Sequence, residues 1–302
     1  MRAFLTGAHG FVGRHLATHL AESGDRNVTP STRVDITDSA ALSDALQLAV
    51  PDVVYHLAAR SSVAASLQDA SAVTRTNVVG TQLVLEAVRR AAPEATVIVV
   101  SSSEVYGAVE GRDQPTSEHH RTAPRNPYAS SKLEVERVAH EAARAGQRVI
   151  IARPFTHVGP GQSTSFVVPA LTRRLLDAKD AGDVSIVVGN LAARRDLSDV
   201  RDVVRAYRLL ALLGVPGETY NVASGHDVAL QDVANELREL VYPGCSFEVD
   251  PSLLRPLDIP STRGDATKLH EATGWEPHFD LGRTLRDVVH FLAPGSIPDE
   301  RR

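Results

Sequence analysis

The chain has 302 residues, of which 43% are apolar and 23% charged, and its formal net charge is -5. This composition is typical of a globular protein and excludes disordered, collagen-like and low-complexity chains. The acidic balance gives no overall attraction to nucleic acid or to anionic lipid, although local arginine clusters can hold an anionic ligand. At roughly 150 residues per domain, the length predicts two domains or one large α/β unit.

The chain contains a single cysteine, Cys245, so no disulfide forms within it and no cysteine-based metal site is expected. The histidines show no spacing with carboxylates that is typical of a metal site, and we expect no metal. No apolar run approaches the roughly 18 residues of a membrane span. The apolar start of the chain meets Gly7 too early for a signal peptide. We therefore expect a cytoplasmic protein that binds neither membrane nor nucleic acid.

The first half of the chain alternates short apolar strands with helical stretches. The expected strands cover residues 3–5, a weak segment around Val28, 34–36, 52–57, 96–100 and 148–152. The expected helices cover residues 11–22, 40–49, 73–91 and 127–145, with a loop at 107–125. Asn126 is a good N-cap, and Pro127 suits the first helical position. Alternation at this spacing predicts an α/β fold, a doubly wound parallel (Rossmann) sheet with helices on both faces.

Beyond Pro154 the alternation loosens, and glycine and proline separate shorter elements. A helix is expected at 203–213 and a strand at 219–222. This irregularity predicts a second, smaller α/β domain whose segments interleave with the sheet domain. The expected dinucleotide-binding domain comprises 1–154 and roughly 203–225, and the expected substrate domain comprises roughly 155–202 and 226–293, before a tail at 294–302.

A glycine-rich turn, GAHGFVG at 7–13, lies between the first expected strand and the first expected helix. Glycines allow a tight turn, a close approach of the backbone to a pyrophosphate, and close packing of the helix on the sheet. The amides and the positive end of the helix then favour phosphate. This context predicts dinucleotide binding. The turn residues expected to contact the cofactor are Gly7, Gly10, Phe11, Val12 and Gly13.

The acidic residue that usually binds the adenosine ribose is missing after the second strand, where the chain reads TPSTR at 29–33. A carboxylate there favours NAD, whereas an arginine can accept the 2′-phosphate of NADP. Arg33 therefore gives a slight preference for NADP over NAD, although the short connection leaves its direction open. The other residues expected beside the cofactor follow the next two strands: Asp35, Ile36, Leu57, Ala58 and Ala59.

Tyr128 and Lys132 are four residues apart on an expected helix, so both side chains share a face. A cation there favours the phenolate and is expected to lower the pKa of Tyr128 toward the range of proton transfer. The segment SSSEVYG at 101–107 follows a strand, and ligands of parallel sheets bind beyond the carboxyl ends of strands. Ser102 is therefore expected to hydrogen-bond a substrate oxygen.

Together, these three motifs resemble the extended short-chain dehydrogenases/reductases, the epimerase/dehydratase family that modifies nucleotide sugars. Within this family, the chain is most similar to the GDP-4-keto-6-deoxy-D-mannose reductases. The other segments that carry the resemblance are HLAARSSV at 56–63, TNVVGT at 76–81, HVGPGQS at 157–163, VGNL at 188–191, RDLSDVRD at 195–202 and LRP at 254–256.

The resemblance implies that hydride passes between the nicotinamide and C4 of the sugar. In that reaction Ser102 hydrogen-bonds the C4 oxygen, and Tyr128 exchanges its proton. Lys132 holds the nicotinamide ribose and tunes Tyr128. Glu104, the fourth expected catalytic residue, lies close to the sugar. Asn77 lies at the cofactor, together with Tyr128 and Lys132.

The resemblance also implies contacts along the nucleotide sugar, with Arg195 and Arg255 at the diphosphate. The other expected substrate-binding residues are Ser62, Ser103, Thr156, His157 and Asn190. Thr156 stands where relatives generally have Asn, so a hydroxyl replaces an amide at one expected contact. In relatives, helices such as those expected at 73–91 and 127–145 pair between subunits, which implies a homodimer.

Three functions stay open. The favoured one is NAD(P)H-dependent reduction of a 4-keto-6-deoxy nucleotide sugar, such as GDP-4-keto-6-deoxy-D-mannose to GDP-D-rhamnose. The second is a 4,6-dehydratase or 4-epimerase with tightly bound NAD(P), in which Glu104 would take the C5 proton. Ser102 speaks against the dehydratase, because those enzymes usually carry Thr at this position. The third is a cofactor-binding sensor without catalysis, which the intact Ser102, Tyr128 and Lys132 disfavour.

Overall fold

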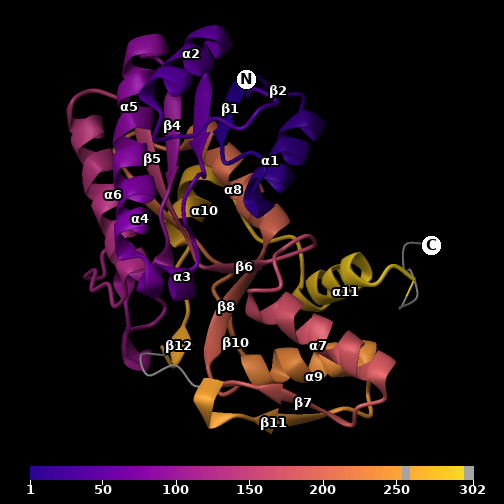
Figure 1. Cartoon of the computed structure of the whole chain (residues 1–302). Helices are drawn as coiled ribbons and strands as arrows, with labels where there is room; N and C mark the ends of the chain where they lie inside the picture. Colours follow the sequence, from indigo (N-terminus) through magenta and orange to yellow (C-terminus); the bar gives the residue numbers. More distant parts are fainter. Residues whose placement is uncertain (254–258, 296–302) are drawn as a thin grey trace.

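The computed structural model describes residues 1–253 and 259–295 (Figure 1). Its largest sheet has six strands, in the order β2-β1-β3-β4-β5-β9. Every neighbouring pair in this sheet is parallel, which confirms the predicted α/β fold. The strands are β1 (Arg2–Thr6), β2 (Arg26–Asn27), β3 (Val53–His56), β4 (Thr96–Val100), β5 (Val149–Pro154) and β9 (Thr219–Val222).

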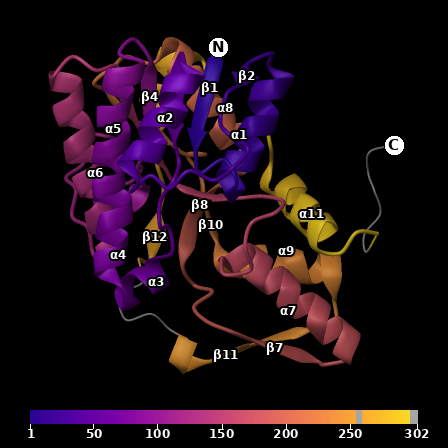
Figure 2. The same ribbon diagram turned by 45° about the horizontal axis from the view of Figure 1, so that its top comes forward.

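Helices cover both faces of this sheet, which explains why its central strands are apolar throughout. In β4, Val97 and Val99 face one helical layer, whereas Ile98 faces the other. The first layer contains α2 (Ser39–Ala49), α5 (Gly80–Ala91) and α6 (Pro127–Arg144). The second contains α1 (Phe11–Glu22), α8 (Val200–Leu213) and α10 (Thr267–Thr273). Figure 2 shows α5 and α6 on one side of the sheet and α1 and α8 on the other.

Below this sheet in Figure 1, smaller sheets and three helices enclose a separate apolar core. Strand β8 pairs in parallel with β6 and β12 and in antiparallel with β10. Strands β7 and β11 form a parallel pair. The bounds are β6 (Thr156–Val158), β7 (Ser185–Val188), β8 (Arg194–Asp199), β10 (Asp227–Ala229), β11 (Ser246–Val249), β12 (Ser261–Thr262), α7 (Val167–Ala181), α9 (Leu230–Val241) and α11 (Leu281–Leu292). The domain boundaries given above stay a prediction.

The third strand expected at 34–36 was wrong. Asp35 Oδ1 accepts hydrogen bonds from the backbone N–H and the hydroxyl of Thr37, both at 2.9 Å, which favours a turn over a strand. This turn leads directly to Asp38, the N-cap of α2. The weak strand expected around Val28 lies slightly earlier, at Arg26–Asn27.

The helix expected at 73–91 is present, but it begins earlier, at Ala70, and contains a π-helical turn. The structure has α3 (Val63–Gln68), α4 (Ala70–Thr74), a π-helical turn η1 (Arg75–Val79) and then α5. Such turns are frequent at functional sites. Here the turn carries Asn77, a predicted cofactor residue.

Three further observations concern the described residues alone. Cys245 is a buried free thiol. Among residues 1–253 and 259–295, no group of three or more His, Cys, Asp or Glu side chains is arranged to hold a metal ion. Over the same ranges, every helix is too short or too polar to cross a membrane.

Candidate active site

The candidate catalytic residues meet where β4 ends and α6 begins. Ser102 follows β4, and its hydroxyl accepts the N–H of Glu104 at 3.2 Å, which caps the 3-10 turn η2 (Ser103–Tyr106). Asn126 caps α6 as predicted, accepting the N–H of Ala129 at 2.8 Å. Tyr128 therefore lies in the first turn of α6, close enough to Ser102 for a hydrogen bond from the serine hydroxyl to act on the pKa of its phenol.

Lys132 lies one helical turn after Tyr128, and its side chain is buried. Its ammonium donates to the carbonyl oxygen of Val100 at 2.7 Å. Burial lowers the pKa of Lys132 to about 8, against the opposing charge of Glu136. Burial also raises the pKa of Tyr128 to about 12, although the hydrogen bond from Ser102 acts in the opposite direction. The expected lowering of the Tyr128 pKa was therefore wrong, because burial dominates.

Glu104 is held beside these residues by Asn126. The side-chain amide of Asn126 donates to Oε2 of Glu104 at 3.1 Å. The charge of Glu104 acts to raise the pKa of Tyr128, so the two side chains are near neighbours. The structure thus brings together all four predicted catalytic residues. The sequence identified Asn126 only as a helix cap, because its contact with Glu104 spans the loop at 107–125.

The glycine turn has the shape that a phosphate requires. Gly7 has φ +76°, and a Cβ there would lie 2.9 Å from the backbone nitrogen of Ala58. A Cβ on Gly13 would lie 2.2 Å from the carbonyl oxygen of Gly7, so only glycine fits. Gly10 precedes α1 and provides no side-chain cap. The first amides of α1, on Phe11, Val12 and Gly13, therefore point to a ligand position.

A hollow of about 400 Å³ lies beside this turn. Its lining comes from the turn, from α1 and from the chain after β2: Ala8, His9, Arg14, Ala17, Thr18, Asn27, Thr29, Pro30 and Ser31. Because the hollow continues from the phosphate position toward the end of β2, it fits the adenosine half of a dinucleotide. The residues present therefore fit a dinucleotide cofactor.

The residues after β2 place positive charge near Asp35. Hydrogen bonds from Thr37 lower the pKa of the Asp35 carboxyl, and the charges of Arg33 and Arg75 lower it further. Arg33 is exposed, whereas Ile36 is only 4% exposed and lies against Gly80. Two arginines, Arg33 and Arg75, therefore lie near Asp35. The sequence predicted only Arg33 as a cofactor residue.

Asn77 connects the chain after β3 to α6. Its Oδ1 accepts the N–H of Arg60 at 2.8 Å, and its Nδ2 donates to Oγ of Ser131 at 2.9 Å. Leu57, Ala58 and Ala59 follow β3, with Ala58 packed against Gly7. These predicted cofactor residues thus border the glycine turn on one side and the catalytic helix on the other. Ser62 is half-buried just before α3.

The other predicted substrate residues lie on separate segments, one before β5 and the rest after it. Thr156 is exposed on β6, and the next residue, His157, stacks on Phe11 with ring centroids 6.2 Å apart. Asn190 Oδ1 accepts the N–H of Ala192 at 3.0 Å. Arg195 donates to the carbonyl oxygen of Ile259 at 2.7 Å. Ser103 is half-buried in η2. Arg255 lies outside the described residues.

A buried polar network, which the sequence patterns did not predict, supports the segment that begins at Ser102. Glu136 accepts from Arg153 and from the hydroxyl of Ser101, which directly precedes Ser102. Arg153 also donates to the Tyr106 hydroxyl at 2.8 Å. The only local signal was a charged residue one turn after Lys132, and this spacing does not identify a partner on β5.

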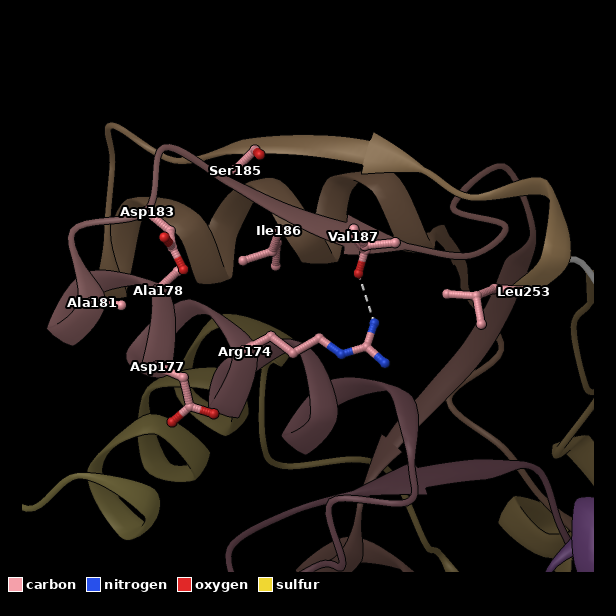
Figure 3. A pocket seen from close by; sticks show the side chains of 9 residues that line it. All are labelled: Arg174, Asp177, Ala178, Ala181, Asp183, Ser185, Ile186, Val187 and Leu253. Atoms are coloured by element: carbon pink, nitrogen blue, oxygen red, sulfur yellow. Dashed lines mark hydrogen bonds between the residues drawn. The ribbon is translucent and has the colours of Figure 1, made fainter.

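A second hollow, of about 440 Å³, lies between α7 and β7 (Figure 3). Arg174 points into it from α7 and donates to the carbonyl oxygen of Val187 at 2.7 Å. The remaining lining residues are Asp177, Ala178, Ala181, Asp183, Ser185, Ile186 and Leu253. None of them is a predicted site residue.

Comparisons with known proteins agree with this geometry. Residues 25–288 match the family model described as GDP-mannose 4,6 dehydratase. The chain is 34% identical to the GDP-6-deoxy-D-mannose reductase of Pseudomonas aeruginosa, over 95% of this chain and 96% of that protein. It is 30% identical to a probable dTDP-glucose 4,6-dehydratase of Sinorhizobium fredii, over 96% of this chain and 92% of that one. The structure of RMD from Pseudomonas aeruginosa complexed with NADPH superposes with a TM-score of 0.89 at 33% identity, covering 96% of this chain and 98% of that chain.

Proposed function

The chain belongs to the GDP-mannose 4,6-dehydratase family of the extended short-chain dehydrogenases/reductases, and on this basis we propose that it is an NAD(P)H-dependent nucleotide-sugar 4-reductase. The substrate we propose is GDP-4-keto-6-deoxy-D-mannose, and the product is GDP-D-rhamnose. The observation that carries the proposal is the near full-length similarity to a GDP-6-deoxy-D-mannose reductase. The assembled Ser102, Tyr128 and Lys132 supply the chemistry that it needs.

In this reaction the bound NAD(P)H supplies hydride to C4 of the sugar. The phenol of Tyr128, with its pKa raised to about 12 by burial, is protonated at neutral pH and donates its proton to the C4 oxygen. Ser102 lies beside Tyr128, so its hydroxyl can donate a second hydrogen bond to the same C4 oxygen and orient it. The ammonium of Lys132 would hold the ribose of the cofactor and would stabilise the phenolate that remains after transfer.

The cofactor would be held by the glycine turn, by the chain after β3 and by Asn77. For the choice between the two nicotinamide cofactors we propose NADPH. Arg33 supports this choice, because it and Arg75 place positive charge where a 2′-phosphate would lie. A relative of similar fold, RMD from Pseudomonas aeruginosa, is complexed with NADPH.

The finer assignments are part of the same proposal. The residues we propose for the nucleotide sugar are Ser62, Ser103, Glu104, Thr156, His157, Asn190, Arg195 and Arg255. We also propose a cytoplasmic homodimer. The single reduced cysteine, Cys245, is consistent with that compartment. Exposed apolar side chains at Leu67 in α3 and Val79 in η1 are consistent with a partner surface beside α5 and α6.

A 4,6-dehydratase or 4-epimerase is the second candidate. The observation in its favour is Glu104, whose carboxylate Asn126 holds beside Tyr128. Such an enzyme regenerates its own NAD(P)⁺ within each cycle, whereas a reductase consumes reduced cofactor. Net consumption of reduced cofactor therefore distinguishes the two candidates.

The test follows reduced nicotinamide at about 340 nm, together with product analysis. One reaction contains enzyme, GDP-4-keto-6-deoxy-D-mannose and NADPH or NADH, and a parallel reaction contains GDP-mannose without added cofactor. We expect stoichiometric oxidation in the first, abolished by Tyr128→Phe. Water loss or a C4 epimer in the second reaction, without oxidation in the first, would contradict the proposal and support the second candidate.

A further inference from the structure

Four buried residues form one line of hydrogen bonds at the carboxyl ends of β1 and β3. Oγ1 of Thr6 is 2.7 Å from Nδ1 of His56, and Nε2 of the same ring is 2.9 Å from Oγ1 of Thr81. The Thr81 hydroxyl is in turn 2.5 Å from the carbonyl oxygen of Asn77. Each of these residues is at most 5% exposed, so water does not compete for the bonds.

The direction of every bond in this line is determined by its ends. The carbonyl of Asn77 can only accept, so Thr81 donates to it and the Thr81 oxygen accepts from His56. The ring therefore carries its proton on Nε2, and Nδ1 accepts from the hydroxyl of Thr6. The Thr6 oxygen can then accept the N–H of Ala58, which lies 3.2 Å away. His56 is thus held in one neutral tautomer.

The line continues from Asn77 to the helix that carries Tyr128. Nδ2 of Asn77 donates to Oγ of Ser131 at 2.9 Å, and this hydroxyl donates to the carbonyl oxygen of Tyr128 at 2.7 Å. At the opposite end, Thr6 directly precedes Gly7 of the glycine turn. Two lines of hydrogen bonds therefore meet at Asn77, one at its backbone carbonyl and one at its side-chain amide, and together they connect the cofactor turn to the backbone of Tyr128.

We propose that His56 is a positioning residue, which fixes the glycine turn relative to Tyr128 so that the cofactor and the proton donor meet the substrate at constant spacing. The inference rests on the proposed reduction, because it assigns Tyr128 and the glycine turn the parts they take there. His56 itself does not exchange protons with the substrate, since both ring nitrogens are bonded within the chain.

The electrostatics of the ring agree with this role. Burial lowers the pKa of His56 to about 3, and the nearby ammonium of Lys132 acts in the same direction. A ring that stays neutral keeps one donor and one acceptor. The hydrogen bonds of His56 to Thr6 and Thr81 require both. A charged ring would instead present two donors, and Thr6 would lose its acceptor.

The first test is the tautomer, measured by NMR on protein labelled with 15N-histidine. We expect a proton on Nε2 of His56 and none on Nδ1, without titration between about pH 5 and 8. Thr81→Val should shift the His56 signals, and Thr81→Ser should restore them. A His56 that titrates in this range, or that carries its proton on Nδ1, would overturn the proposal.

The second test separates positioning from packing by kinetics. Thr172→Val is the matched control for Thr81→Val, because Thr172 is also fully buried and donates to a carbonyl four residues earlier, that of Val168. We expect Thr81→Val to lower kcat about tenfold, and Thr6→Val to raise the KM for NADPH about tenfold. Thr172→Val should leave both unchanged, and Thr81→Ser should recover kcat.

These outcomes keep the inference distinct from the proposed function. If Thr81→Val and Thr6→Val lost only stability, with kcat and the KM for NADPH equal to those of Thr172→Val, His56 would merely fill the core and the proposal would be wrong. If the natural protein did not reduce the keto sugar, the proposed function alone would fail. The tautomer of His56 and the Kd of the Thr6→Val variant for NADPH would still test the role of the hydrogen-bonded line.

Discussion

The guanidinium of Arg153 on β5 binds the carboxylate of Glu136 on α6 through two hydrogen bonds, of 2.6 and 2.8 Å. Both side chains are almost fully buried, and Ser101 adds a third bond to the same carboxylate. The pair therefore ties the end of β4, where Ser102 begins the catalytic segment, to the helix of Tyr128. Removing either partner would leave the other charge buried without a partner or water, which would destabilise the folded protein.

We expect Arg153→Met to lower the free energy of unfolding by about 3–5 kcal/mol, because it leaves the Glu136 carboxylate buried without a partner. Arg137→Met is the control on the same helix, since Arg137 is half-exposed and its ion pairs with Glu134 and Glu141 are open to solvent. The measurement is urea unfolding, compared at equal m-values. Equal midpoints for the two variants would contradict the assigned role of the buried pair.

Local sequence patterns predicted the structure correctly where neighbouring residues determine it. The Val- and Ile-rich run at 96–100 became β4 with the predicted bounds, and Asn126 with Pro127 began α6 as expected. The glycine turn could be predicted for the same reason, since its backbone requirements lie within one short segment. Tyr128 and Lys132 met because helical spacing places them on one face.

The remaining features depend on contacts between segments far apart in the chain. The expected helix contains a π-helical turn, and Gly80, which follows this turn, lies against Ile36; sequence periodicity reveals neither feature. His56 looks like an isolated histidine in the sequence, and only the fold places Thr6 and Thr81 at its two nitrogens. The pKa of Tyr128 was predicted with the wrong sign, because burial is a property of the folded chain.

The pH dependence of the reduction should follow Lys132. Its pKa is lowered to about 8, so the ammonium, which we propose holds the ribose, is present below that pH and is lost as the pH rises through it. Tyr128, with a pKa of about 12, stays protonated over the same range and does not limit the reaction. We therefore expect kcat/KM for NADPH to be constant below about pH 8 and to fall above it.

Lys132→Arg provides the control for this assignment. Arginine stays charged throughout the range, so this variant should be slower but should lack the inflection near pH 8. Identical pH profiles for the two proteins would show that another group causes the decline.

Arg33→Ala should weaken NADPH selectively. The 2′-phosphate would lose a charged partner, and we expect the KM for NADPH to rise about tenfold while the KM for NADH stays unchanged. Arg89→Ala, an exposed arginine in the last turn of α5, is the matched control and should change neither value. If Arg33→Ala raised both KM values equally, Arg33 would not distinguish the cofactors.

Glu104→Gln should separate reduction from water loss. Reduction at C4 needs the proton of Tyr128 and no base at C5, so we expect the variant to retain kcat within about threefold. Glutamine keeps the size of the side chain, and its carbonyl oxygen can still accept the hydrogen bond from Asn126. The measurement is NADPH oxidation with the keto sugar, alongside product analysis with GDP-mannose. A loss of reduction greater than about a hundredfold would mean that the carboxylate takes part in proton transfer at C4.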